Sequence, residues 1–160
     1  MGRRGASLHT EVNSYDIMAI MNTERTRSVD NQFKVITPVD MKPRPDAYEE
    51  EVARILARKF QSDILFVPPI NSLHAPDLQV VRDGKFWEIK NIRGNAKNTI
   101  EDNLKKAAKQ SENVVISLLR TKMTPVQAAA RIRHNLSRSH GNIKNVILIT
   151  KGGKTLDFHG

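Results

Sequence analysis

The amino-acid sequence predicts an α/β protein, an α/β/α sandwich in which helices cover both faces of a central mixed sheet. Short apolar runs with the length of buried strands alternate with longer segments whose apolar residues recur every three or four positions, as on one face of a helix. With 160 residues, 39% of them hydrophobic, the chain is long enough to bury the core that such a sandwich requires.

The first 45 residues are predicted to lie outside this sandwich. They show little periodic apolar pattern beyond a short helix near residues 15–21, and they end in a proline cluster at Pro38, Pro43 and Pro45. We therefore expect residues 1–45 to be a linker or arm, partly disordered, and residues 46–160 to form the folded domain.

The first helix of the domain is expected to follow Asp46, a favourable N-cap, and to end near Phe60. Three glutamates in its first turn, Glu49, Glu50 and Glu51, complement the positive end of the helix dipole. Its apolar residues form one stripe, which consists of Tyr48, Val52, Ile55, Leu56 and Phe60.

The remaining elements follow from turn and cap signals. Apolar runs at 64–67, 78–81 and 86–92 predict strands, the last two joined by an Asp83-Gly84 hairpin turn. A capping box of Thr99 and Asp102 predicts a second helix, and Thr124-Pro125 opens a third. Buried strands are expected at 114–119 and 146–150, and a Gly152-Gly153 turn leads to a last strand at 155–158.

Composition excludes several classes of protein. The chain has no cysteine, so it has neither disulfides nor thiolate metal sites, and no apolar run approaches the roughly 20 residues of a membrane-spanning helix. The N-terminus has no apolar block of the kind a signal peptide requires. The net charge is +9, and residues 81–160 carry sixteen Lys/Arg against six Asp/Glu. Such asymmetry indicates a polyanionic partner, nucleic acid first, with membrane surfaces and acidic proteins as alternatives.

One stretch carries candidate catalytic residues. Pro76-Asp77 is followed, after ten residues, by Glu88-Ile89-Lys90. On a strand, Glu88 and Lys90 point to one face, and pairing across the hairpin brings Asp77 near them. Two converging carboxylates are tolerated when a cation lies between them, and their hard oxygens, with the Ile89 carbonyl, suit Mg²⁺ or Mn²⁺. Lys90 would then activate water or neutralise transition-state charge. The alternative is an exposed hairpin salt bridge.

These residues resemble the PD-(D/E)xK motif of restriction-endonuclease-like nucleases. More narrowly, residues 46–120 are similar to the C-terminal toxin nuclease domains of contact-dependent growth inhibition (CdiA-type) proteins and related polymorphic toxins. The resemblance implies a restriction-endonuclease-like core and metal-dependent cleavage of nucleic acid, often tRNA. It also implies an acidic cognate immunity protein, a larger carrier or delivery protein N-terminal to the domain, and action in the bacterial cytoplasm, including that of a target cell.

The resemblance adds two further site residues. Many members carry a glutamate on the preceding helix, and Glu49 both matches that spacing and lies nearest the apolar stripe, at about 100° per residue. It would help to bind metal or position water; the alternative is that all three glutamates only complement the dipole. Gln110 matches a glutamine of the resembling toxins and would touch phosphate or the metal-bound water, unless it is exposed and uninvolved.

Basic residues outside the motif are candidates for contacts with the phosphate backbone. The alternative is that they solvate helix faces. The candidates are Arg93, Lys97, Lys106, Arg131 and Arg133.

The leading hypothesis is a metal-dependent nuclease toxin domain that hydrolyses phosphodiester bonds, with tRNA as substrate. The competing hypotheses are a DNA endonuclease of the same fold, acting in restriction, repair or mobile elements, and a catalytically inactive nucleic-acid-binding module.

Overall fold

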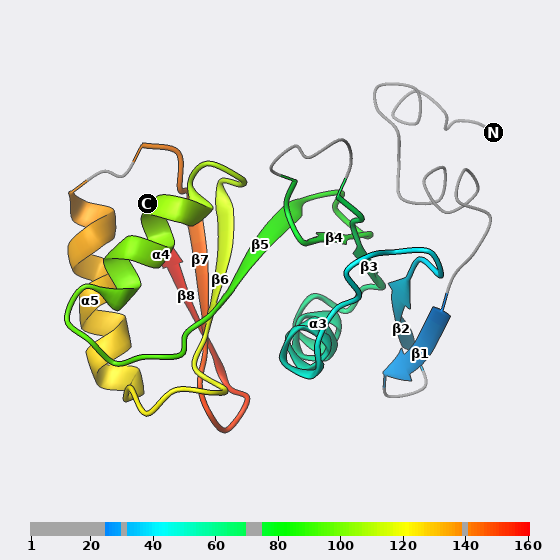
Figure 1. Ribbon diagram of the computed structural model, residues 1–160, viewed down its shortest axis with the longest axis horizontal. Helices are drawn as coiled ribbons and strands as arrows, with labels where there is room; N and C mark the ends of the chain where they lie inside the picture. Colours follow the sequence, from blue (N-terminus) through cyan, green and yellow to red (C-terminus); the bar gives the residue numbers. More distant parts are fainter. Residues whose placement is uncertain (1–24, 30–31, 70–74, 139–140) are drawn as a thin grey trace.

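The computed structural model describes residues 25–29 (backbone only), 32–69, 75–138 and 141–160. Its described part is an eight-stranded mixed sheet whose strands lie side by side in sequence order, from β1 to β8. Helix α3 covers one face and helices α4 and α5 cover the other (Figure 1). The predicted α/β/α sandwich with a central mixed sheet is therefore confirmed. The elements are β1 Arg25–Val29, β2 Phe33–Thr37, α3 Ala47–Phe60, β3 Ile64–Phe66, β4 Leu78–Val80, β5 Phe86–Asn91, α4 Thr99–Ala107, β6 Asn113–Ser117, α5 Pro125–Ser137, β7 Asn145–Ile149 and β8 Thr155–His159.

Connections between strands follow a simple rule. The parallel pairs β2–β3, β5–β6 and β6–β7 are each bridged by a helix, whereas β1–β2, β3–β4, β4–β5 and β7–β8 are antiparallel. Parallel neighbours need such a crossover because the chain must return to the same end of the sheet. Among the described helices, none has the length and apolar character needed to cross a membrane.

Strands β1 and β2 correct the predicted linker. The described part of residues 1–45 contributes two strands, and Val35 and Ile36 of β2 are buried. Strand β2 was missed because five residues give little periodicity, and its stability depends on parallel pairing with Ile64 and Leu65, far along the chain. The folded domain therefore does not begin at residue 46. The helix expected near residues 15–21 lies outside the described residues.

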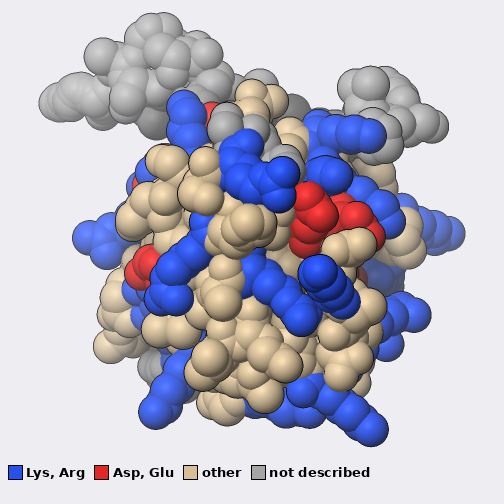
Figure 2. All heavy atoms as spheres, turned by 90° about the vertical axis from the view of Figure 1, so that its left-hand side faces the viewer, with Lys and Arg blue, Asp and Glu red and all other residues tan. Residues whose placement is uncertain are grey.

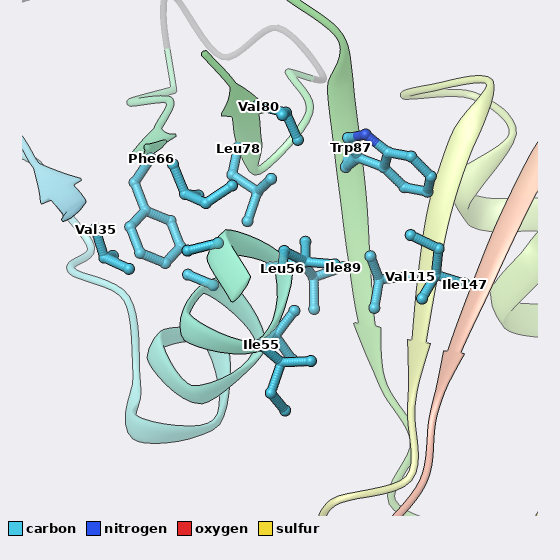
Figure 3. Packing of buried hydrophobic residues seen from close by; sticks show 14 of the residues in the cluster. Val35, Ile55, Leu56, Phe66, Leu78, Val80, Trp87, Ile89, Val115 and Ile147 are labelled. Carbon is cyan, nitrogen blue, oxygen red and sulfur yellow. The ribbon is translucent and has the colours of Figure 1, made fainter. Parts of the chain in front are cut away.

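Helix α3 forms as predicted. Asp46 caps it through a reciprocal capping box, in which the Asp46 side chain accepts from the Glu49 N–H and the Glu49 side chain accepts from the Asp46 N–H. Its buried face includes Ile55 and Leu56, and Leu56 lies beside Ile89 of the sheet (Figure 3). This cap and this face fix where the first turn of the helix meets the sheet.

The β4–β5 hairpin turns as predicted at Gly84, whose φ of 76° is strained for side-chain-bearing residues. Side chains of β5 alternate: Trp87 and Ile89 join the core under α3, where the Trp87 ring lies 5.7 Å from that of Phe60. Glu88 and Lys90 therefore face the opposite side of the strand. The hairpin thus brings both motif residues to one face.

The second core lies under α4 and α5. Thr124 caps α5 through a capping box with Gln127, as its sequence predicts. The capping box expected at Thr99 is wrong: Thr99 is already the first helical residue, and Asn98 stands at the N-cap without a side-chain cap bond. Apolar side chains from α4, α5 and alternate positions of β6 and β7 form this core, including Ile100, Leu104, Val114, Ile116, Ile132, Val146 and Leu148.

Candidate active site

Asp77 is anchored beside the centre of β5. Its N–H donates to the Trp87 carbonyl at 3.0 Å and its carbonyl accepts from Val67 at 2.9 Å, so the backbone is held between two strands. Its Oδ2 accepts from the Ile89 N–H at 2.7 Å. Burial raises the pKa of Asp77, and this hydrogen bond from the Ile89 backbone opposes the rise. The Asp77 carboxyl group is therefore fixed close to Glu88 and Lys90.

Glu88 and Lys90 contact each other with little exposure to water. Lys90 Nζ lies 3.0 Å from Glu88 Oε2, and the two side chains are only 18% and 4% exposed. Burial and the adjacent Asp77 raise the pKa of Glu88 to about 8, against the opposing charge of Lys90. The alternative of an exposed hairpin salt bridge does not describe this arrangement, because water reaches little of either side chain.

The Glu88 carboxyl group shares a side-chain hydrogen bond with Asp77, but its Oε1 atom accepts no hydrogen bond from any described residue. This Oε1 atom is buried. A buried polar atom without a partner is costly, and in native proteins it is usually satisfied by water, an ion or a ligand. Glu88 Oε1 therefore marks a place where a further group would be bound.

Gln110 contacts Lys90. It follows α4, and its Oε1 accepts from Lys90 Nζ at 3.3 Å while its Nε2 donates to the Ala75 carbonyl at 3.5 Å. Gln110 thereby links the lysine to the segment that precedes Asp77. It is neither exposed nor uninvolved, because its half-buried side chain contacts the ammonium group of Lys90.

Glu49, in the first turn of α3, lies near Asp77. Burial raises the pKa of Glu49, the hydrogen bond from Asp46 opposes the rise, and the charge of Asp77 adds to it. Glu51, by contrast, pairs with Arg54 at 2.7 Å on the helix surface. Glu49 therefore combines two roles that the sequence separated: it completes the helix cap and it faces Asp77.

Three of these residues line one cavity of about 220 Å³, here called the site cavity. Glu49, Asp77 and Gln110 line it from three separate elements. Sequence reasoning missed one of its walls, because that wall comes from the segment expected to be a linker. The described residues of this wall are Met41, Pro43, Arg44 and Pro45.

The donor atoms fit a hard divalent cation in part. Asp77 and Glu88 supply carboxylate oxygens, one of them unpartnered, and their mutual repulsion would be relieved by a cation between them. In the described part of the chain, no three His, Cys, Asp or Glu side chains converge on one point. Mg²⁺ typically uses only one or two carboxylates and completes its coordination with water and phosphate, so two suffice.

The predicted basic residues lie away from the site cavity, on α4, on α5 and in the loop between β5 and α4. Arg93 and Lys97 are exposed in the loop between β5 and α4, and Arg131 from α5 donates to the Ala96 carbonyl of that loop at 3.2 Å. Lys106 is exposed on α4, while Arg133 lies over the Phe158 ring at 5.3 Å. None of these five lines the site cavity. Figure 2 shows lysine and arginine spread over the face that α4 and α5 form.

The fold and this site define a class: an α/β/α protein with a buried carboxyl pair and a lysine at the hairpin of its sheet. The family described as the contact-dependent growth inhibition CdiA C-terminal domain matches residues 75–155, half of the chain. The chain therefore belongs to that family.

A solved structure supports the shared fold. It is described as the CdiA-CT/CdiI toxin and immunity complex from Burkholderia pseudomallei. The TM-score is 0.57 at 20% sequence identity, and the alignment covers 77% of this chain and 96% of the other. Among curated proteins, none matches this sequence.

Proposed function

We propose that this chain is a metal-dependent nuclease toxin domain that hydrolyses phosphodiester bonds, with tRNA as its substrate. The observation that carries the proposal is the buried Asp77–Glu88 pair, with Lys90 3.0 Å from Glu88, at the edge of a cavity. Structural ion pairs rarely retain an unpartnered buried carboxylate oxygen, whereas sites that bind ions and substrates do so. Membership of the CdiA C-terminal family supports a toxin, and the PD-(D/E)xK spacing supports a nuclease.

Asp77 and Glu88, with the Ile89 carbonyl, would hold Mg²⁺ or Mn²⁺, and Glu49, which does not converge with these two carboxylates on one point, would act on water. Such an ion supplies charge stabilisation at a phosphate oxygen and lowers the pKa of water. Lys90 is fixed by Glu88 Oε2 and Gln110 Oε1, so its remaining N–H can orient the attacking water or neutralise charge on the phosphate. Glu49 positions water at the opposite wall. In-line attack of water would cut the strand without a covalent enzyme intermediate.

The proposed partners follow from the family and from charge. The neighbouring structure is a toxin and immunity complex, so we propose a cognate immunity protein here, acidic because half of this chain carries a balance of +10. We also propose a carrier or delivery protein N-terminal to the domain, and action in the cytoplasm of a bacterial target cell. Arg93, Lys97, Lys106, Arg131 and Arg133 would contact the phosphate backbone of the substrate.

A cleavage assay tests the proposal. Purified protein is incubated with tRNA, total RNA and plasmid DNA in Mg²⁺, Mn²⁺ or EDTA. We expect cleavage of tRNA with either metal and none in EDTA, and loss of cleavage in Asp77→Asn and Lys90→Gln. Asp102→Asn, an exposed carboxyl on α4, is the matched control and retains activity.

Each other result has a meaning. Cleavage of plasmid alone would assign a DNA endonuclease of the same fold. Binding of either polymer without cleavage in any metal would assign an inactive binding module. Full activity of Asp77→Asn would remove the proposed site.

A further inference from the structure

One wall of the site cavity comes from the turn that follows β2. Met41 is only 9% exposed and its N–H donates to the Pro38 carbonyl at 3.1 Å, which closes this turn against the core. Arg44 and the prolines beside it line the cavity together with Asp77 and Gln110. Residues 38–45 are here called the strap. The strap lies outside residues 75–155, to which the family match is confined.

Among the described residues that line the cavity, two carry carboxyl groups and one carries a guanidinium group. They are Glu49 and Asp77, the pKa of each raised by burial, and Arg44, the single cation of this described lining. Lys90 is engaged by Glu88 and Gln110 and does not line the cavity. A phosphate that entered here would find one guanidinium group among the described residues that line the cavity.

Two hydrogen bonds hold the Arg44 side chain, but they use only one of its three guanidinium nitrogens. Its NH1 donates to the Val39 carbonyl at 3.0 Å and to the Pro38 carbonyl at 3.3 Å, which fixes the guanidinium on the strap. Within the described residues its Nε and NH2 make no hydrogen bond, and no carboxylate pairs with it. A fixed guanidinium plane with free N–H groups on one edge suits the two oxygens of a phosphodiester.

We propose that Arg44 is a substrate-binding residue that holds a backbone phosphate of the nucleic acid in the site cavity, beside the phosphodiester that is cut. This inference rests on the proposed nuclease function. It adds a contact from the strap to those expected from the basic face of α4 and α5. Arg44 would fix the register of the strand relative to Asp77 and Glu88, because a bound phosphate cannot slide without breaking paired hydrogen bonds.

The test measures binding rather than cleavage. Glu88→Gln is the common background, so that no substrate is cut, and Arg44→Gln, Arg44→Lys and the control Arg58→Gln are added to it. Arg58 is an exposed arginine near the C-terminal end of α3 and does not line the site cavity. Fluorescence anisotropy gives the Kd for a labelled 12-nucleotide single-stranded RNA and for tRNA between 50 and 200 mM NaCl.

Arg44→Gln is expected to raise the Kd about tenfold, because a charge-assisted contact is lost. It should also lower the slope of log Kd against log salt by about 0.7 for the single strand, as for one phosphate contact. Arg58→Gln should leave both values within twofold of the background. Arg44→Lys should keep the slope, since the charge stays, and weaken binding less than Arg44→Gln.

Three results would overturn the inference. The first is a Kd and slope for Arg44→Gln equal to those of Arg58→Gln. The second is equal weakening by Arg44→Gln and Arg44→Lys with an unchanged slope, which would make Arg44 only a support of the strap; circular dichroism melting of both variants accompanies the titration. The third is absence of nucleic-acid binding in the Glu88→Gln background itself, which would instead refute the proposed function and with it the premise of this inference.

Discussion

The protonation of the Glu88 carboxyl group makes the stability of the fold depend on pH. Its pKa is raised from an ordinary value near 4.5 to about 8 by burial and by Asp77, so the folded protein retains a proton that the unfolded chain has released. Between these two values the folded state binds more protons than the unfolded state. Its free energy of unfolding must therefore fall as pH rises through this window.

We expect this fall to amount to a few kcal/mol in metal-free protein between about pH 4.5 and 8. Urea unfolding in EDTA at pH 5, 6, 7 and 8 measures it. Glu88→Gln, which carries no titrating proton, should flatten the profile relative to the native chain. Parallel profiles for the two proteins would show that Glu88 is not the group responsible.

The same carboxyl pair predicts how a divalent ion affects stability. An ion that binds only the folded protein raises its unfolding temperature by mass action. We expect millimolar Mg²⁺ at pH 7.5 to raise the unfolding temperature of the native chain and of Glu112→Gln. Glu112 serves as a surface control, because its carboxyl group forms an exposed ion pair with Lys144. Asp77→Asn and Glu88→Gln should show no rise. An equal rise in all four proteins would place the ion elsewhere.

Single residues also show how far sequence reasoning reached. Asp77, Glu88 and Lys90 could be predicted because strand alternation and one hairpin turn determine which way they point. The contact of Gln110 with Lys90 could not, since it depends on where α4 ends relative to β5. Arg44 was missed for a different reason: its place in the site depends on β2, a strand that is held by pairing with β1 and β3.

At the scale of an element, the first turn of α3 joins helix stability to the site. Glu49 Oε1 accepts from the Asp46 N–H at 2.9 Å, and the same carboxyl group senses the charge of Asp77. A capping partner needs only an acceptor oxygen, whereas a group that binds metal or positions water needs its charge. A substitution that keeps the acceptor oxygen of Glu49 and removes its charge can therefore separate the capping role from the role in the site.

Glu49→Gln keeps the acceptor and removes the charge. We expect its free energy of unfolding to stay within about 0.5 kcal/mol of the native value, while the cleavage rate falls by about one order of magnitude or more. Asp46→Ala should do the reverse, costing about 1 kcal/mol of stability with a smaller effect on rate. Equal cleavage by Glu49→Gln and the native chain would leave Glu49 only its capping role.

Elements with a cap, a turn signal or a buried apolar run were predicted well, including β3, β6 and β7, whereas β1 and β2 were not. Asp46, Thr124 and Gly84 mark their helix starts and turn within a few residues of sequence, and the structure agrees with each. Thr99 shows the limit of such signals. A capping-box pattern shifted by one residue still matched the sequence, but the backbone begins the helix at Thr99 itself.

For the whole molecule, the boundary of the folded unit has a measurable consequence. A chain that starts at residue 46 would lose β1, β2 and the strap, and with them the buried side chains of Val35 and Met41 and the partner of β3. Burial of two such side chains contributes roughly 3–6 kcal/mol, which is comparable with the total stability of a small domain.

We therefore expect residues 46–160 to melt without a cooperative transition, and residues 25–160 to melt cooperatively near the unfolding temperature of the full chain. Thermal unfolding followed by circular dichroism distinguishes the two. A cooperative transition of the shorter chain at the temperature of the longer one would show that β1 and β2 are dispensable.

The order of the sheet bears on how the chain reaches its structure. All eight strands pair only with strands that are adjacent to them in sequence. Each new strand closes a loop no longer than one helix and its two connections, so the entropy lost at each step is small, and no segment has to be threaded between strands already in place. An unfolded chain can thus rebuild its sheet strand by strand, in the order of the strands along the sequence.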